Sequence, residues 1–251
     1  ATPNRGDGKG LRSVFNNCSH QIEITTLIRE GFLVPPKSYV VDYGVGDQLN
    51  NVSRKGNDFD MEQVEAIMNH KVINDKVVTE WIERAEGRKT VVFCSTIKHA
   101  EDLLESFVEH NIDAKLVTGD TPKDERAETL NELAYGDLKV VVNVSVLTEG
   151  FDAPAVSCIV LTRPCSQKGT MVQMIGRGLR TIDPEEFPGV VKTNCVVLDC
   201  GTSVLTHGSL EDAVDLDDKE KGEAPLKECP ECESYVPMGV QECPVCGYLY
   251  H

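Results

Sequence analysis

Five apolar runs separated by helical segments constrain the fold of this 251-residue chain more than any other feature. In four of these runs, three or more apolar residues stand at consecutive positions instead of at every second one, which is typical of strands buried on both faces of a sheet. The runs are residues 90–95, 113–119, 139–145, 157–163 and 194–200. Strands that alternate with helices in this way predict an α/β fold, in which helices cover both faces of a mostly parallel sheet.

Helical periodicity marks the segments around these runs. Residues 58–86 and the segment after residue 96 are expected to be helical, since apolar residues recur there at helical spacing. Another helix is expected after residue 120, with Thr121 as its N-cap and Pro122 in its first position. A further short strand is expected at residues 39–42.

Polar, glycine-containing segments follow several of the predicted strands. They are residues 95–96, 145–152, 163–166 and 199–201. Because ligands of parallel α/β sheets bind beyond the carboxyl ends of the strands, this arrangement indicates a nucleotide-type domain without identifying its ligand.

The net charge of −16 limits the partners that the surface as a whole can bind. Non-specific binding of DNA or RNA depends on neutralising phosphates, so a contact with nucleic acid must use a local surface or another domain. No apolar run approaches the length of a membrane span, so we expect no membrane partner, and the first residues do not resemble a secretory signal. Six scattered cysteines fit a reducing compartment, and we expect the cytoplasm of a bacterial or phage-infected cell.

Residues 226–251 carry a metal-binding pattern. Cys229, Cys232, Cys243 and Cys246 form two C-x2-C pairs separated by ten residues. Two such pairs complete a tetrahedral shell of thiolates around one ion, so we predict a closed, structural zinc site, although iron also accepts four thiolates. The alternative is that the four thiols are unrelated or form two redox pairs.

The role of this zinc ribbon is left open by the sequence. Tyr235, Tyr248 and Tyr250 are able to stack on nucleic-acid bases. The segment is acidic rather than basic, however, so a role in folding or in contact with a protein is at least an equal alternative.

The sequence QMIGRGLR, residues 173–180, places Arg177 and Arg180 three positions apart on what should be one turn of helix. Arginines in this arrangement suit a nucleotide phosphate. Yet the chain has no G-x-x-x-x-G-K-[ST] phosphate loop, since GDGKG at residues 6–10 lacks the required spacing. It also has no Asp-Glu pair after an apolar strand to hold Mg²⁺.

Three segments together resemble superfamily 2 helicases and translocases. VLTEGFDAPAVS at residues 146–157 and QMIGRGLR resemble motifs V and VI of that family, and VVFCST at residues 91–96 resembles motif IV. The resemblance covers about residues 1–205, including an opening ATP tripeptide that is similar to the end of motif III. The RPC at residues 163–165 and the GRGLR form of motif VI resemble the branch of RadD-like, type I and III restriction and UvrB-related motors. Within that branch, the four-cysteine ribbon makes the RadD-type bacterial DNA-repair motors the most similar.

The resemblance implies a RecA-like domain that completes an ATP site shared with another domain. In this family the first RecA-like domain supplies the phosphate loop and the Mg²⁺ ligands, and the second supplies arginines. Arg180 would be the arginine finger, Arg177 would also approach the γ-phosphate, and Gln173 would hold their segment in register with the nucleotide. Gly150 and Asp152 resemble the GxD element of motif V, in which Asp152 would pair with a motif VI arginine or the ribose, or simply cap a helix.

Other residues of these motifs are implied to contact nucleic acid. Thr148 resembles the motif V residue that touches the bound strand, and Ser95 and Thr96 resemble a second phosphate contact. The alternative is that Ser95 and Thr96 only cap the helix over residues 97–110. DNA is the expected polymer, RNA is the alternative, and repair proteins are possible partners.

The chain thus divides into four parts. Residues 1–37 lead from a first motor domain that we expect to have been cut away, 38–205 form the second RecA-like domain, 206–225 an acidic linker and 226–251 the zinc ribbon. The arginines are then expected on an open surface, at the carboxyl edge of the sheet beside residues 150–152. The alternative functions are a non-enzymatic module that binds a partner protein, and the motor part of a restriction enzyme.

Overall fold

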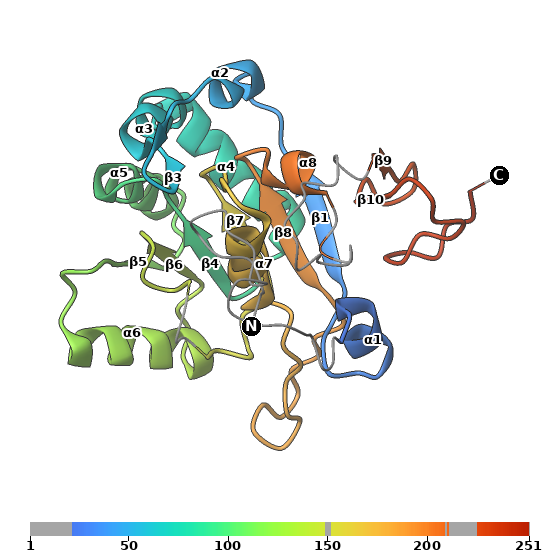
Figure 1. Ribbon diagram of the computed structural model, residues 1–251. Coiled ribbons are helices and arrows are strands. Elements are labelled where there is room, and N and C mark those ends of the chain that lie inside the picture. The colour runs from blue at the N-terminus through green and yellow to red at the C-terminus, as the bar shows by residue number, and fades with distance from the viewer. Residues whose placement is uncertain (1–21, 149–151, 209, 211–224, 251) are drawn as a thin grey trace, which may run out of the picture.

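A six-stranded parallel sheet forms the centre of the protein (Figure 1). The computed structural model describes residues 22–148, 152–208, 210 and 225–250. The strands, in spatial order, are β1 (Pro36–Val40), β8 (Cys195–Asp199), β7 (Cys158–Leu161), β4 (Thr90–Phe93), β6 (Val140–Asn143) and β5 (Ala114–Val117). The five predicted strands are confirmed, and the strand expected at residues 39–42 lies slightly earlier, as β1.

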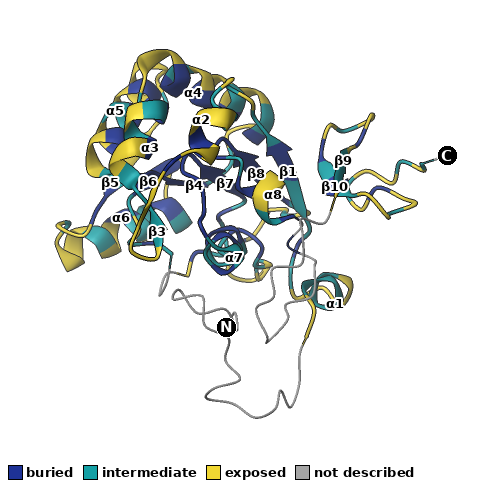
Figure 2. Ribbon diagram, turned by 45° about the horizontal axis from the view of Figure 1, so that its top comes forward, coloured by how far each residue is buried: buried dark blue, intermediate teal, exposed yellow. Residues whose placement is uncertain are grey.

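Helices cover both faces of this sheet because the strands are apolar on both sides. In β4, Val91 and Phe93 point into one core cluster and Val92 into the other. The first cluster includes residues of α6 (Lys123–Tyr135) and α7 (Lys168–Gly176). The second includes residues of α2 (Gly46–Asn50), α3 (Met61–Met68), α4 (Lys71–Ala85) and α5 (Ile97–Glu109). Figure 2 shows the buried residues between these layers and the exposed residues on the outer sides of the helices, and the predicted RecA-like fold is confirmed.

Shorter elements extend this core. Helix α1 (Ile24–Arg29) precedes β1, α8 (Ser203–His207) follows β8, and β2 (Arg54–Lys55) forms a hairpin with β3 (Asp58–Phe59). In the ribbon, β9 (Leu226–Glu228) pairs antiparallel with β10 (Tyr235–Pro237). Within the described ranges, no helix is both long and apolar enough to cross a bilayer.

Two details of the predicted helices are wrong. The helix expected over residues 58–86 is interrupted, because Asp60 caps the start of α3 and the chain leaves helical geometry at Asn69 before α4 begins. Thr121 does not cap α6, which begins at Lys123. Its hydroxyl instead accepts a hydrogen bond from the amide of Thr118 at 2.9 Å, and so closes the turn after β5.

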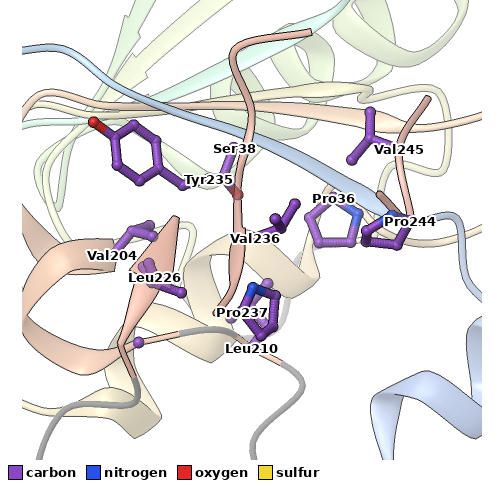
Figure 3. Close-up of a pocket in the computed structure, with 11 residues that line it drawn as sticks. Pro36, Ser38, Val204, Leu210, Leu226, Tyr235, Val236, Pro237, Pro244 and Val245 are labelled. Atoms are coloured by element: carbon purple, nitrogen blue, oxygen red, sulfur yellow. The ribbon is translucent and has the colours of Figure 1, made fainter. Parts of the chain in front are cut away.

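The ribbon packs against the β1 edge of the sheet. Strand β10 lies beside β1, and a crevice of about 30 Å³ between the two parts is lined by Pro36, Leu226 and Val236 among others (Figure 3). Arg84 of α4 joins the two parts, since its guanidinium donates to Glu233 at 2.9 Å and lies 4.4 Å from the centre of the ring of Tyr39 in β1. The ribbon therefore shields an edge strand of the sheet.

The loops after β7 and β8 approach each other closely at the carboxyl edge. A Cβ atom at Gly201 would overlap the carbonyl group of Arg163 and the nitrogen of Pro164. Beside it, the buried carboxylate of Asp199 accepts hydrogen bonds from the amides of Gly201 at 3.1 Å and Val204 at 2.5 Å. Burial raises the pKa of Asp199 to about 6, and these amides act in the opposite direction.

Replacing Gly201 by alanine should destabilise the protein by about 1–3 kcal/mol, because the added methyl group must displace backbone atoms. Gly119→Ala is the control, since a Cβ atom there meets open space and should change the free energy of unfolding by no more than about 0.5 kcal/mol. Urea unfolding followed by circular dichroism measures both variants. Equal free energies of unfolding would contradict the close approach of the two loops.

Candidate functional site

Four thiols of the ribbon form a metal-binding cluster. The Sγ atoms of Cys229, Cys232, Cys243 and Cys246 all lie within 4.8 Å of one another, with 3.7 Å between Cys229 and Cys246 and 3.8 Å between Cys232 and Cys243. A tetrahedral zinc ion with Zn–S bonds of about 2.3 Å separates its sulfurs by about 3.8 Å. The donor set and its spacing therefore fit zinc, in a closed shell that leaves no position for a substrate.

The three tyrosines of the ribbon take part in its packing. Tyr235 lines the crevice against β1. The rings of Tyr248 and Tyr250 meet edge to face at 5.2 Å, and the Nζ of Lys227 lies 3.4 Å from the centre of the Tyr250 ring. These contacts favour a role in folding over a surface for stacking bases.

The arginine segment begins in α7 and ends outside it. Helix α7 ends at Gly176, so the expected helical turn is wrong beyond that residue. Arg180 instead forms an antiparallel bridge with Leu33, three residues before β1 begins. Gly178 allows this turn, because a Cβ atom there would overlap the Sγ of Cys195 in β8.

The two arginines contact the segment that follows β6. Arg177 donates from Nε and Nη2 to the carbonyl oxygen of Thr148, at 3.0 and 2.6 Å. Arg180 forms an ion pair with Asp152. A motif VI arginine is one of the partners that the sequence left open for the carboxylate of Asp152. The side chains of Arg180 and Asp152 are 41% and 66% exposed, so this pair lies on an open surface, as expected.

The place of the pair in the sheet differs from the expectation. The carboxyl edge was expected, but the bridge to Leu33 puts Arg180 at the amino end of β1. The physical reason is that α7 runs back along the sheet from the carboxyl end of β7 to the amino end of β8, and Asp152 likewise lies in the connection that leads to the amino end of β7. Gln173 is half-buried on α7, and Gly150 lies outside the described residues.

Ser95 and Thr96 follow β4 at the carboxyl edge, away from the arginines. Thr96 caps α5: its hydroxyl accepts the amide of His99 at 3.1 Å and donates to Glu65 at 2.7 Å. Ser95 is buried and shares a hydrogen bond of 3.0 Å with Nδ1 of His99, whose pKa is lowered to about 4 by burial. The capping alternative is thus confirmed for Thr96, and contact of either residue with nucleic acid stays a prediction.

Two side chains that no sequence motif indicated, those of Lys192 and Phe187, hold the segments around Arg180 and Asp152 in place. Lys192 donates to two main-chain carbonyls just after Asp152, and Phe187 stacks on Tyr135 of α6. Lys192 and Phe187 lie between Arg180 and β8, in a segment that no motif covers. A lone lysine or phenylalanine carries no sequence signal for such contacts, which only the tertiary structure creates.

Comparison with known families assigns two parts of the chain. Residues 73–181 match the helicase conserved C-terminal domain. Residues 227–251 match an uncharacterised protein family, UPF0547, which together with the cysteine cluster fits the predicted zinc ribbon. Among solved structures, the C-terminal domain of the DEAD-box protein Dbp5 is similar at 20% identity with a TM-score of 0.43, over 55% of this chain and 77% of that one.

The curated relatives are longer than this chain. A 51.5 kDa protein of a Lactococcus phage is 24% identical over 99% of this chain and 54% of its own length. IRC3 of Saccharomyces cerevisiae, named as a candidate ATP-dependent helicase, is 29% identical over 72% of this chain and 26% of its own length. UvrABC system protein B of Fervidobacterium nodosum is 35% identical over 42% of this chain and 17% of its own length. The chain therefore spans about half or less of the relatives it matches.

Purified protein should contain about one zinc ion per chain by atomic absorption, since four thiolates fill one tetrahedral shell. Cys232→Ala should lose the metal. The control variant, Cys94→Ala, removes a buried thiol outside the cluster and should keep it. An undiminished metal content in Cys232→Ala would contradict the assignment of the four ligands.

Proposed function

We propose that residues 73–181, which match the helicase conserved C-terminal domain, belong to a superfamily 2 helicase-like ATPase, and that this chain supplies the arginines of an ATP site shared with a first RecA-like domain. The whole protein is then an ATP-dependent helicase or translocase. Since the chain spans 54% or less of its longer relatives, the first domain is expected in the remainder of the same polypeptide.

The exposed pair of Arg180 and Asp152 is the observation that carries this proposal. An ion pair between solvent-exposed groups is worth only about 0–1 kcal/mol, so a phosphate with its greater charge competes readily for the guanidinium. Arg177 is oriented nearby by two hydrogen bonds to the main chain. Cations that are held in place beside an open surface are suited to meet a nucleotide carried by another domain.

Each residue then has a defined role at the nucleotide. Bound ATP, with Mg²⁺ held by the first domain, supplies the phosphoryl group that is transferred to water. Arg180 donates to oxygens of the γ-phosphate and stabilises the charge that develops there, a role worth about 10³–10⁵ in rate in related enzymes. Arg177 approaches the same phosphate, and Gln173 keeps α7 in register with the nucleotide. Asp152, once displaced from Arg180, accepts a hydrogen bond from the ribose.

We propose DNA as the polymer and DNA repair as the setting. The similarity to UvrABC system protein B and the resemblance to RadD-type motors motivate both. Thr148 beside Arg177, and Ser95 and Thr96 at the carboxyl edge, would contact phosphates through two local surfaces, because the net charge of −16 opposes broad electrostatic binding. RNA is the alternative, and competition between DNA and RNA strands of equal length for the full-length protein distinguishes the two.

In the full-length protein, Arg180→Ala should lower kcat for DNA-stimulated ATP hydrolysis by about 10³-fold or more and leave DNA binding largely intact. Arg177→Ala should act in the same direction. The control, Lys76→Ala, removes an exposed cation from α4 on the other face of the sheet and should change neither property.

Steady-state kinetics and fluorescence anisotropy with a labelled oligonucleotide measure these two properties. Equal losses of ATPase activity and of DNA affinity in Arg180→Ala would assign the arginines to the nucleic-acid groove instead.

The 251-residue chain alone should not hydrolyse ATP in the presence of DNA, because its sequence contains no phosphate loop. Phosphate release in a malachite-green assay tests this expectation. Turnover that Arg180→Ala abolishes would mean that the chain holds a complete site.

A further inference from the structure

Lys192 joins the segment after Arg180 to the segment after Asp152. Its half-buried ammonium group donates to the carbonyl oxygens of Pro154 at 2.7 Å and Val156 at 2.6 Å. These carbonyls lie two and four residues beyond Asp152, the partner of Arg180. The side chain of Lys192 therefore fixes the path of the backbone next to Asp152, whose carboxylate pairs with Arg180.

A second contact holds the same segment. We refer to residues 181–192, between Arg180 and β8, as the strap. The ring of Phe187 in the strap stacks on Tyr135 of α6, with 5.3 Å between ring centres and 3° between ring planes. The hydroxyl of Tyr135 also donates to Glu186. The strap is thus attached to α6 at its middle and, through Lys192, to the backbone that follows Asp152.

The surroundings of Lys192 are unfavourable for a cation. Burial lowers its pKa to about 8; Cys195 of β8 acts to raise the pKa, and Arg180 after α7 and Arg88 before β4 lower it. The two carbonyl oxygens offset part of the lost hydration of the ammonium group. Cations with pKa values perturbed by burial are enriched at functional sites.

We propose that Lys192 is a positioning residue for the arginine site: by holding the carbonyls of Pro154 and Val156, it keeps Asp152 opposite Arg180 until the nucleotide phosphate takes the place of this carboxylate, and so sets the direction from which Arg180 meets the phosphate. This inference rests on the proposed function. Lys192 itself touches neither nucleotide nor nucleic acid.

The proposal has a pH dependence with a definite sign. Lys192 is charged below a pH of about 8 and loses its proton as the pH rises through that value. A neutral amine donates weaker hydrogen bonds than an ammonium group, so the hold on Pro154 and Val156 weakens in the same range. Arginine keeps its charge throughout this range and can still donate to the carbonyls.

The test compares Lys192→Met and Lys192→Arg with the wild type in the full-length protein. Lys192→Met should lower kcat for ATP by about tenfold with little change in KM, because the loss affects the transition state and not the binding of substrate. In the wild type, kcat should fall as the pH rises through about 8. Lys192→Arg should recover most of the activity and remove this fall.

Lys89→Met is a matched control. The ammonium group of Lys89 also donates to two carbonyls, those of Gly136 and Leu138, but before β4 and without a link to Asp152. The Lys89→Met variant should lose thermal stability, as Lys192→Met does. It should leave kcat and the pH profile of ATP hydrolysis unchanged. Equal kinetic effects of Lys89→Met and Lys192→Met would overturn the positioning role, as would an unaltered kcat in Lys192→Met.

Hydrogen exchange separates this proposal from the proposed function. In Lys192→Met, amides of residues 153–157 should exchange faster than in the wild type, while those of α4 keep their rates. Unchanged exchange would overturn the proposal whatever the ATPase result. An inactive wild-type protein, or an Arg180→Ala variant as active as the wild type, would overturn the proposed function instead, and the exchange of residues 153–157 still decides whether Lys192 holds this segment.

Discussion

Main-chain carbonyl oxygens between β6 and β7 bind cationic side chains from the chain after α7, and the arrangement of the proposed site depends on this contact. Thr148 holds Arg177, and Pro154 and Val156 hold Lys192. A carbonyl oxygen is an obligatory acceptor whose place is set by the backbone. The directions of the cations are therefore fixed by the path of the chain, and only the exposed pair of Arg180 and Asp152 is left to exchange its partner.

Strand β1 connects the arginine site to the zinc ribbon. At the amino end of β1, the residues that lead into the strand hold the chain around Arg180. Leu33 forms the bridge with Arg180, and the amide of Val34 donates a hydrogen bond of 2.8 Å to the carbonyl oxygen of Leu179. At its outer edge β1 carries β10 of the ribbon. Because folding of a small ribbon of this kind is coupled to metal binding, a metal held by the four thiols would also support the strand beside which the arginines lie.

The fold was predictable because its strands are apolar on both faces, a pattern that few other architectures produce. The four cysteines were predictable from spacing alone, since two C-x2-C pairs specify one tetrahedral shell. The edge of the sheet at which Arg180 lies was predictable but was predicted wrongly, since a helix between two parallel strands returns the chain to their amino ends. The residue at which α7 stops was not predictable, because it depends on the close approach of Gly178 to Cys195. The role of Lys192 was not predictable either, because its partners are main-chain carbonyl oxygens, which every residue possesses.

The central claim is that Arg180 acts on a nucleotide held by another domain, and only as the transition state forms. The most direct test measures the affinity of the full-length protein for ADP and for ADP with aluminium fluoride, with and without Arg180→Ala. If Arg180 acts in this way, the variant loses at least about 10²-fold in affinity for the transition-state analogue and almost nothing for ADP. Equal losses for both ligands, or no loss for either, would contradict this claim.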